Sequence, residues 1–151
     1  MTTRTATDKD TLTVERIYDA SQADVFDAWI DATKTAHWWG CQNTFKVDST
    51  IDAREGGAYQ HLMHIDGVGE YLIDAVLLEI RPPEYLAYEL AAEGPMPAMT
   101  VKVSFTPIGD RTKVMLVQSP LLDALHNTVS AGWTASFERL SDFLSGARRA
   151  A

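Results

Sequence analysis

One predicted strand places two side chains together that could do acid–base chemistry. Side chains alternate between the faces of a strand, so Tyr59, His61, Met63 and Ile65 share one face of the segment 57–65. Histidine has a reference pKa of about 6.5, which suits a general acid or base near neutral pH. With Tyr59 beside it as a hydrogen-bond donor, His61 could polarise or deprotonate a carbonyl compound, as cyclases and isomerases do. The other interpretation is that His61 only orients a ligand or lies in the core.

The remaining reactive side chains favour structural roles. Cys41 lies four residues after His37, but no second cysteine or histidine pair lies near enough to complete a zinc site. Cys41 also has no identifiable base that would activate it as a nucleophile. Glu70 and Asp74 share one face of the next predicted strand and are interpreted as solvated carboxylates, although an inward Asp74 would be a partner for His61. We therefore predict no metal site and no cofactor.

The N-terminal part of the chain predicts one strand followed by two short helices. Residues Leu12–Tyr18 indicate a strand because polar and apolar side chains partly alternate there. Ser21 with Asp24 three residues later is typical of a helix N-terminus, and apolar residues at helical spacing extend this helix over 22–31. A second helical segment is predicted over 33–38.

The rest of the chain predicts a succession of strands and then one long helix. The predicted strands are 44–47, 57–65, 70–80, 84–90, 99–105 and 112–118. Beyond them, large apolar residues recur every three or four positions from Leu125 to Leu144, which indicates an amphipathic helix. Ser119 and Pro120 would begin this helix, and Gly146 would end it.

This order of elements favours an α+β fold. An antiparallel sheet of six or seven strands has an apolar face that must be covered. The C-terminal helix, at about 20 residues or ~30 Å, is the only predicted element long enough to cover it. A curved sheet around one helix leaves a space that side chains fill or that stays open as a cavity. Periodicity alone favours a filled core, because stripes of Trp and Phe are more often core than ligand wall.

Composition restricts the class of function. The chain has 151 residues, which favours one domain, and a net charge of −8, which disfavours binding to nucleic acid or anionic lipid. It has no secretory signal and no apolar run near the ~20 residues that a membrane span needs. A single cysteine fits a reducing compartment, so we expect a cytoplasmic protein. The polar residues 1–10 are predicted to be a flexible tail before a single domain at 11–147.

Five segments in a fixed order carry a family resemblance. They are Val25-Phe26-Asp27-Ala28-Trp29, Trp38-Trp39-Gly40, the stretch from Asp52 to Tyr59, Pro82-Pro83-Glu84-Tyr85-Leu86, and Gly132-Trp133. Together with the order of elements, they make residues 10–146 similar to the AHSA1-like branch of the START/Bet v 1-type (SRPBCC) superfamily. The resemblance implies a helix-grip fold, in which a curved antiparallel sheet grips a long C-terminal helix around a ligand cavity. Family members often have proline and an aromatic residue where this chain has Cys41 and His61, so a more polar pocket is implied.

The resemblance and the apolar pattern together predict binding of a small hydrophobic or aromatic molecule, for carriage, sensing or detoxification. The resemblance implies that the Tyr59 face of its strand points inward. The predicted lining is Trp29, Tyr59, His61, Met63, Val101, Val103, Phe105, Trp133 and Phe137.

Two other functions are considered. One is a polyketide-cyclase-like or isomerase-type enzyme that uses His61 as general base with Tyr59 beside it. The other is regulation of an Hsp90-type chaperone, which the family name implies. The chain lacks the extra N-terminal domain of the eukaryotic co-chaperones, so Hsp90 binding is not expected. We expect no nucleic-acid partner and no membrane insertion, and the sequence leaves the choice between monomer and homodimer open.

Overall fold

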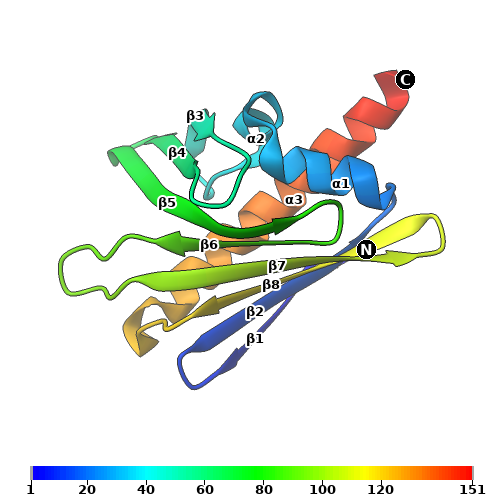
Figure 1. Cartoon of the computed structure of the whole chain (residues 1–151). Helices are drawn as coiled ribbons and strands as arrows, with labels where there is room; N and C mark the ends of the chain where they lie inside the picture. The colour runs from blue at the N-terminus through cyan, green and yellow to red at the C-terminus, as the bar shows by residue number, and fades with distance from the viewer. Residues whose placement is uncertain (1, 151) are drawn as a thin grey trace.

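Eight antiparallel strands form one curved sheet in the computed structural model, which describes residues 2–150 (Figure 1). In chain order the elements are β1 (Arg4–Asp8), β2 (Thr11–Tyr18), α1 (Gln22–Ile30), α2 (Ala32–Trp38), β3 (Thr44–Ile51), β4 (Ala58–Ile65), β5 (Gly69–Arg81), β6 (Tyr85–Leu90), β7 (Met99–Ile108), β8 (Arg111–Ser119), a 3-10 turn (Asp123–Leu125) and α3 (His126–Ala150). The strand order across the sheet is β1-β2-β8-β7-β6-β5-β4-β3.

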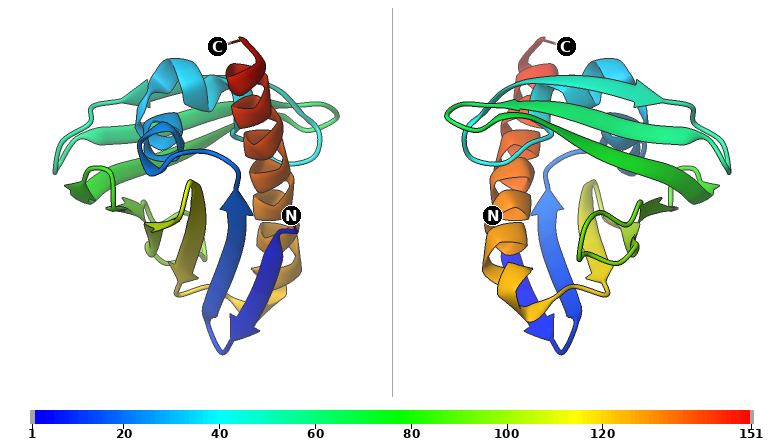
Figure 2. Two further views of the ribbon diagram at one scale, coloured as in Figure 1. Left: turned by 90° about the vertical axis from the view of Figure 1, so that its right-hand side faces the viewer. Right: turned by 90° about the vertical axis from the view of Figure 1, so that its left-hand side faces the viewer.

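The long helix α3 lies against the inner face of the curved sheet, and α1 and α2 cover one end (Figure 2). This arrangement confirms the α+β helix-grip fold. No helix within residues 2–150 is long and apolar enough to cross a bilayer.

The sheet has eight strands instead of the six or seven expected, and the strand that was missed is β1. It pairs with β2 from Arg4 opposite Glu15 to Asp8 opposite Thr11, so these residues are not the flexible tail that the sequence suggested. All five β1 side chains are exposed. An edge strand of this kind is held by backbone hydrogen bonds, and hydrophobic periodicity cannot reveal it.

Helix α1 begins at Gln22 as predicted and α2 begins at Ala32, one residue before its predicted start, and each has a side-chain cap. The hydroxyl of Ser21 accepts a hydrogen bond from the backbone N–H of Asp24 at 3.2 Å, which caps α1. The carboxylate of Asp31 accepts from the backbone N–H of Thr33 at 2.9 Å, which caps α2. These caps set the directions in which α1 and α2 present their tryptophans to the core.

The C-terminal helix differs from its predicted limits at both ends. Ser119 is the last residue of β8, where it pairs with Thr100, so it cannot also begin a helix, and α3 starts only at His126. At the other end α3 continues through Gly146 to Ala150. A glycine costs helix stability but does not by itself end a helix.

Candidate functional site

The interior between the sheet and α3 contains a cavity of about 760 Å³ beside the N-terminal half of α3. It lies between this half of the helix and the inner side of strands β4 to β8, with the β6–β7 loop along one edge. The residues that line it are Trp39, Gly40, Cys41, Met63, Glu70, Tyr71, Leu72, Ile73, Asp74, Tyr88, Leu90, Ala91, Ala92, Glu93, Met96, Met99, Gln118, Leu125, Thr128, Val129, Gly132, Trp133 and Ser136. The volume is within the range of small-molecule sites, about 300–1,000 Å³.

The inner surface of the cavity is mostly apolar. Strands contribute Met63, Ile73 and Met99, and α3 contributes Val129 and Trp133. Methionine side chains adapt their shape more readily than branched ones, which suits a surface that must fit a ligand.

Gly132 gives the cavity part of its room. It lies in the interior of α3 with helical backbone, and a Cβ added there would meet only the Cβ of Cys41, at 3.8 Å. A glycine in a helix interior costs about 1 kcal/mol relative to alanine. Because neither the backbone nor a close neighbour requires glycine here, the observed consequence of Gly132 is space along the cavity wall.

Polar side chains interrupt the apolar surface, among them Gln118 and Tyr88. The indole N–H of Trp133 donates to Oε1 of Gln118 at 2.8 Å, and Nε2 of Gln118 has the Met99 sulfur at 3.5 Å as its partner. The hydroxyl of Tyr88, whose ring borders the cavity, is buried and has no hydrogen-bond partner among the described residues. Burial raises the pKa of Tyr88 well above its usual value, so this hydroxyl keeps its proton.

The rim of the cavity is acidic. Glu93 is exposed at its edge, where its carboxylate accepts a hydrogen bond from the Tyr71 hydroxyl at 3.3 Å. Glu70 and Asp74 also border it, but they lie on the outer face of β5 beside His64 and Gln60. Among the described residues that line the cavity, none is Lys, Arg or His. A ligand entering here therefore meets negative charge and no cation.

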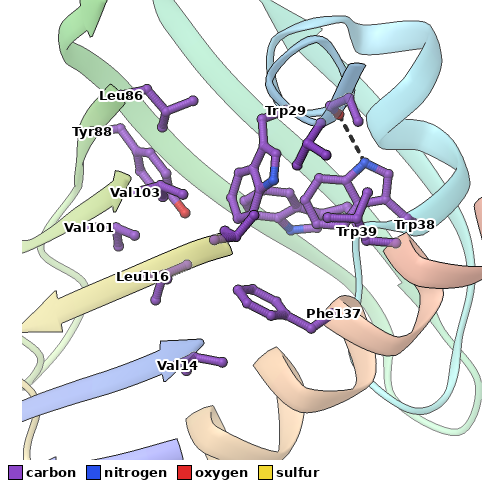
Figure 3. Packing of buried hydrophobic residues seen from close by; sticks show 14 of the residues in the cluster. Val14, Trp29, Trp38, Trp39, Leu86, Tyr88, Val101, Val103, Leu116 and Phe137 are labelled. Carbon is purple, nitrogen blue, oxygen red and sulfur yellow. Dashed lines mark hydrogen bonds between the residues drawn. The ribbon is translucent and has the colours of Figure 1, made fainter. Parts of the chain in front are cut away.

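The other half of the space beside α3 is filled by aromatic rings, which Figure 3 shows gathered between the helix and the sheet. Trp29 lies at the centre, with its ring centroid 4.7 Å from Trp38, 6.1 Å from Phe105 and 6.2 Å from Phe137. The indole N–H of Trp38 donates to the carbonyl of Ala28 at 2.9 Å. None of these four rings lines the cavity of about 760 Å³ or a second one of about 430 Å³ between α2, β3 and the C-terminal half of α3.

Most of the predicted lining residues belong to the packed half. Of the nine predicted lining residues, Met63 and Trp133 border the cavity. The other seven are buried in the core and do not line it, which corrects the prediction: Trp29, Tyr59, His61, Val101, Val103, Phe105 and Phe137. Their inward orientation was predicted correctly, but α1 and α2 bring additional aromatic rings against them.

His61 lies behind Trp39 and does not reach the cavity. The two rings stack with centroids 3.7 Å apart, and Nδ1 of His61 lies 2.9 Å from the Ser49 hydroxyl. Burial lowers the pKa of His61 from 6.5 to about 3, so the imidazole is neutral at physiological pH. Its Nε2 is buried without a partner. The core interpretation of His61 is therefore the one that the geometry supports.

Tyr59 is also a buried core residue. Its hydroxyl donates to the backbone carbonyl of Trp29 at 2.7 Å. Tyr59 and His61 touch edge to face, with ring centroids 4.6 Å apart, but neither lines the cavity. The structure thus brings the predicted acid–base pair together without giving it access to a substrate.

The other candidates take structural positions. Asp74 faces away from His61 and accepts a hydrogen bond from Gln60 at 2.9 Å, so it is the solvated carboxylate that was expected. His37 stacks on Phe143, with ring centroids 5.4 Å apart. The Cys41 sulfur lies 3.3 Å from the Thr44 hydroxyl. In the described part of the chain, no group of three or more His, Cys, Asp or Glu side chains could hold a metal ion.

Sequence reasoning missed several lining residues for which a signal existed. Thr112, Val114, Leu116 and Gln118 alternate as buried residues along β8, so Gln118 is a polar residue on the inner face. An amide at an inward position of an apolar strand suggests a polar contact inside the protein. Gly132 in the middle of an amphipathic helix was the second signal.

A family model described as "Activator of Hsp90 ATPase homolog 1-like protein" matches residues 19–145. No curated protein sequence matches the chain.

Solved structures with a similar fold come from several bacteria. Protein CV1439 from Chromobacterium violaceum is 23% identical, with a TM-score of 0.81 over 89% of this chain and 96% of that one. CalU16 from Micromonospora echinospora is 22% identical, with a TM-score of 0.73 over 96% of this chain and 87% of that one. The AHSA1 (SPO3351) protein from Silicibacter pomeroyi is 20% identical, with a TM-score of 0.75 over 89% and 97%. At these identities the likeness establishes the fold alone.

Proposed function

The chain belongs to the Activator of Hsp90 ATPase homolog 1-like family, and from that premise we propose that it binds a small, largely apolar molecule in the cavity beside the N-terminal half of α3. The observation that carries the proposal is a cavity of about 760 Å³ whose inner surface is apolar and whose helical wall contains Gly132. Apolar cavities with a few placed polar groups are how proteins hold small ligands.

The geometry gives less support to an enzyme that uses His61. Its ring is covered by Trp39, and its only polar partner among the described residues is Ser49. A general base must come within hydrogen-bond distance of the proton that it removes. Binding without catalysis by His61 is therefore the function that we carry forward.

Titration with Nile red, a neutral dye that fluoresces in apolar surroundings, tests this proposal. The wild-type protein should bind the dye with a saturable rise in fluorescence. Gly132→Leu places a side chain in the cavity and should weaken binding about tenfold or more, which corresponds to about 1.4 kcal/mol. It should not lower the melting temperature, because leucine favours helix more than glycine does.

Gly146→Leu is the matched control. Gly146 lies on the same helix, is exposed and does not line the cavity, and a Cβ added there would have no neighbour within 4 Å. This variant should bind Nile red like the wild type. If the wild-type protein does not bind the dye, or if the two variants lose affinity equally, binding in this cavity is refuted.

A further inference from the structure

We propose that the cavity selects neutral apolar molecules that carry a carbonyl oxygen and rejects carboxylates of the same shape. This inference rests on the proposed function and names the ligand class of that site. It depends on two features: buried donors without adequate acceptors beside the cavity, and negative charge at the rim without any cation among the described lining residues.

The first donor is the side-chain amide of Gln118. An indole N–H can only donate, so the amide oxygen of Gln118 must face Trp133, where the distance is 2.8 Å. The amide nitrogen then points elsewhere with two N–H groups, and its partner is the Met99 sulfur at 3.5 Å. A thioether is a weak acceptor. Gln118 is only 3% exposed, so this donor lacks both water and a strong partner.

The second donor is the hydroxyl of Tyr88. It is buried without a hydrogen-bond partner among the described residues, and Tyr88 is 0% exposed. In the sheet, Tyr88 is opposite Val101, and Val101 is opposite Gln118, so all three lie in one row across β6, β7 and β8. Adjacent strands are about 4.8 Å apart, which puts the Tyr88 and Gln118 backbones roughly 10 Å from each other on the same face. The Tyr88 hydroxyl is fully buried, so a ligand oxygen reaches it only when a neighbouring side chain shifts, and Gln118 is the primary donor.

These donors favour a ligand that brings an acceptor. A buried donor without a partner is costly, and an oxygen that accepts from it recovers that cost. A carbonyl oxygen provides two lone pairs without adding charge or a further donor. An apolar molecule with no oxygen would leave both donors as they are.

Charge excludes the carboxylate alternative. Glu93 stands at the rim, and no described lining residue is Lys, Arg or His; Glu70 and Asp74 lie on the outer face of β5, beside His64 and Gln60. The chain as a whole has a net charge of −8. A carboxylate in the cavity would be a buried charge without a counterion, which is strongly unfavourable. The donors at Gln118 and Tyr88 are neutral and do not offset it.

Three compounds of nearly one shape test the selection: 2-ethylnaphthalene, 2-acetylnaphthalene and 2-naphthoate, each titrated against bound Nile red near neutral pH. We expect 2-acetylnaphthalene to bind about 3- to 10-fold more tightly than 2-ethylnaphthalene, the gain of one hydrogen bond. We expect 2-naphthoate to bind at least about 30-fold more weakly than the ketone, because its charge is not paired.

Single-residue variants test which side chains cause the preference for the ketone. Gln118→Leu should reduce the affinity ratio between the ketone and 2-ethylnaphthalene to about 2-fold or less. Tyr88→Phe breaks no hydrogen bond within the described chain, so it folds regardless and should lower the same preference by a smaller factor. Glu93→Gln removes the charge at the rim and should strengthen 2-naphthoate binding relative to binding of the two neutral compounds.

The possible outcomes distinguish a failure of the proposed selectivity from a failure of the proposed ligand binding. If no compound displaces Nile red, or if Nile red does not bind at all, the proposed function fails and the selectivity with it. If all three compounds bind with equal affinity, or if the carboxylate binds best, the cavity is a binding site but the proposed selectivity is wrong. If neither Gln118→Leu nor Tyr88→Phe alters the preference for the ketone, the donors named here do not cause it.

Discussion

The two halves of the space beside α3 differ in which elements contribute side chains to them. From Phe137 toward the C-terminus of α3, α1 brings Trp29 against Phe105 and Phe137, α2 brings Trp38 against Trp29, and the rings fill the interior. At the N-terminal half no further helix of the described chain contributes, and α3 presents Gly132 instead of a large residue. One sheet and one helix thus hold a packed core and a cavity side by side. The positions of α1 and α2 therefore determine which half of the space is filled by side chains.

The largest difference between the halves should appear when a large side chain is removed. Trp29→Ala should lower the free energy of unfolding by about 3–5 kcal/mol, because Trp29 is fully buried among rings that cannot collapse into the space. Leu125→Ala, at the partly exposed edge of the cavity, should cost about 1 kcal/mol or less. Urea unfolding of both variants measures this, and equal costs would contradict the division into a packed and an open half.

The packed half should also make stability depend on pH through His61. Its pKa is lowered from 6.5 to about 3 by burial, so in acid the unfolded chain binds a proton that the folded protein does not. Stability from this residue is complete above about pH 6.5 and falls as the pH drops toward 3. Between about pH 7.5 and pH 5.5 the loss should be about 1.4 kcal/mol.

The variant His61→Gln isolates this contribution, because glutamine does not titrate. Urea unfolding at both pH values should show a smaller loss for the variant than for the wild type. An equal loss in the two proteins would mean that His61 is protonated as easily in the fold as in the unfolded chain.

In the open half, a slightly larger side chain should raise the stability of the protein. Gly132→Ala should raise the free energy of unfolding by about 0.5–1 kcal/mol, because alanine favours helix and its Cβ would meet only Cys41, at 3.8 Å. Thermal unfolding measures the gain. A loss of stability would show that the wall of the cavity at Gly132 is already closely packed.

The smallest effect is expected at Tyr88, which borders both halves. Its hydroxyl makes no hydrogen bond within the described chain, so Tyr88→Phe should change the free energy of unfolding by no more than about 0.5 kcal/mol. Urea unfolding provides the comparison with Trp29→Ala. A cost above about 1 kcal/mol would reveal a partner for this hydroxyl.

The sequence predicted what depends on local pattern. The Ser21 cap and the periodicity of α3 followed from neighbouring residues, and the alternation along β4 correctly put Tyr59, His61 and Met63 on one inner face. Strand β1 was missed because it contributes only backbone hydrogen bonds at the edge of the sheet.

The position of the cavity could not be predicted in the same way. It depends on where Trp29 meets Phe105 and Phe137, which are far away in the sequence. Inward orientation and access to a ligand are therefore separate properties, and periodicity reports only the first. The inward polar Gln118 and the helical Gly132 are local sequence features that indicate where the cavity lies.

The indole N–H signals of the four tryptophans test the central claim most directly, since two tryptophans line the cavity and two do not. In a ¹H–¹⁵N NMR titration with 2-acetylnaphthalene, the Trp133 signal should shift most, because its N–H bonds to Gln118 at the cavity surface. The Trp38 signal, held by the Ala28 carbonyl in the packed half, should stay in place. A titration that moves Trp38 and leaves Trp133 unchanged would contradict a ligand site beside the N-terminal half of α3.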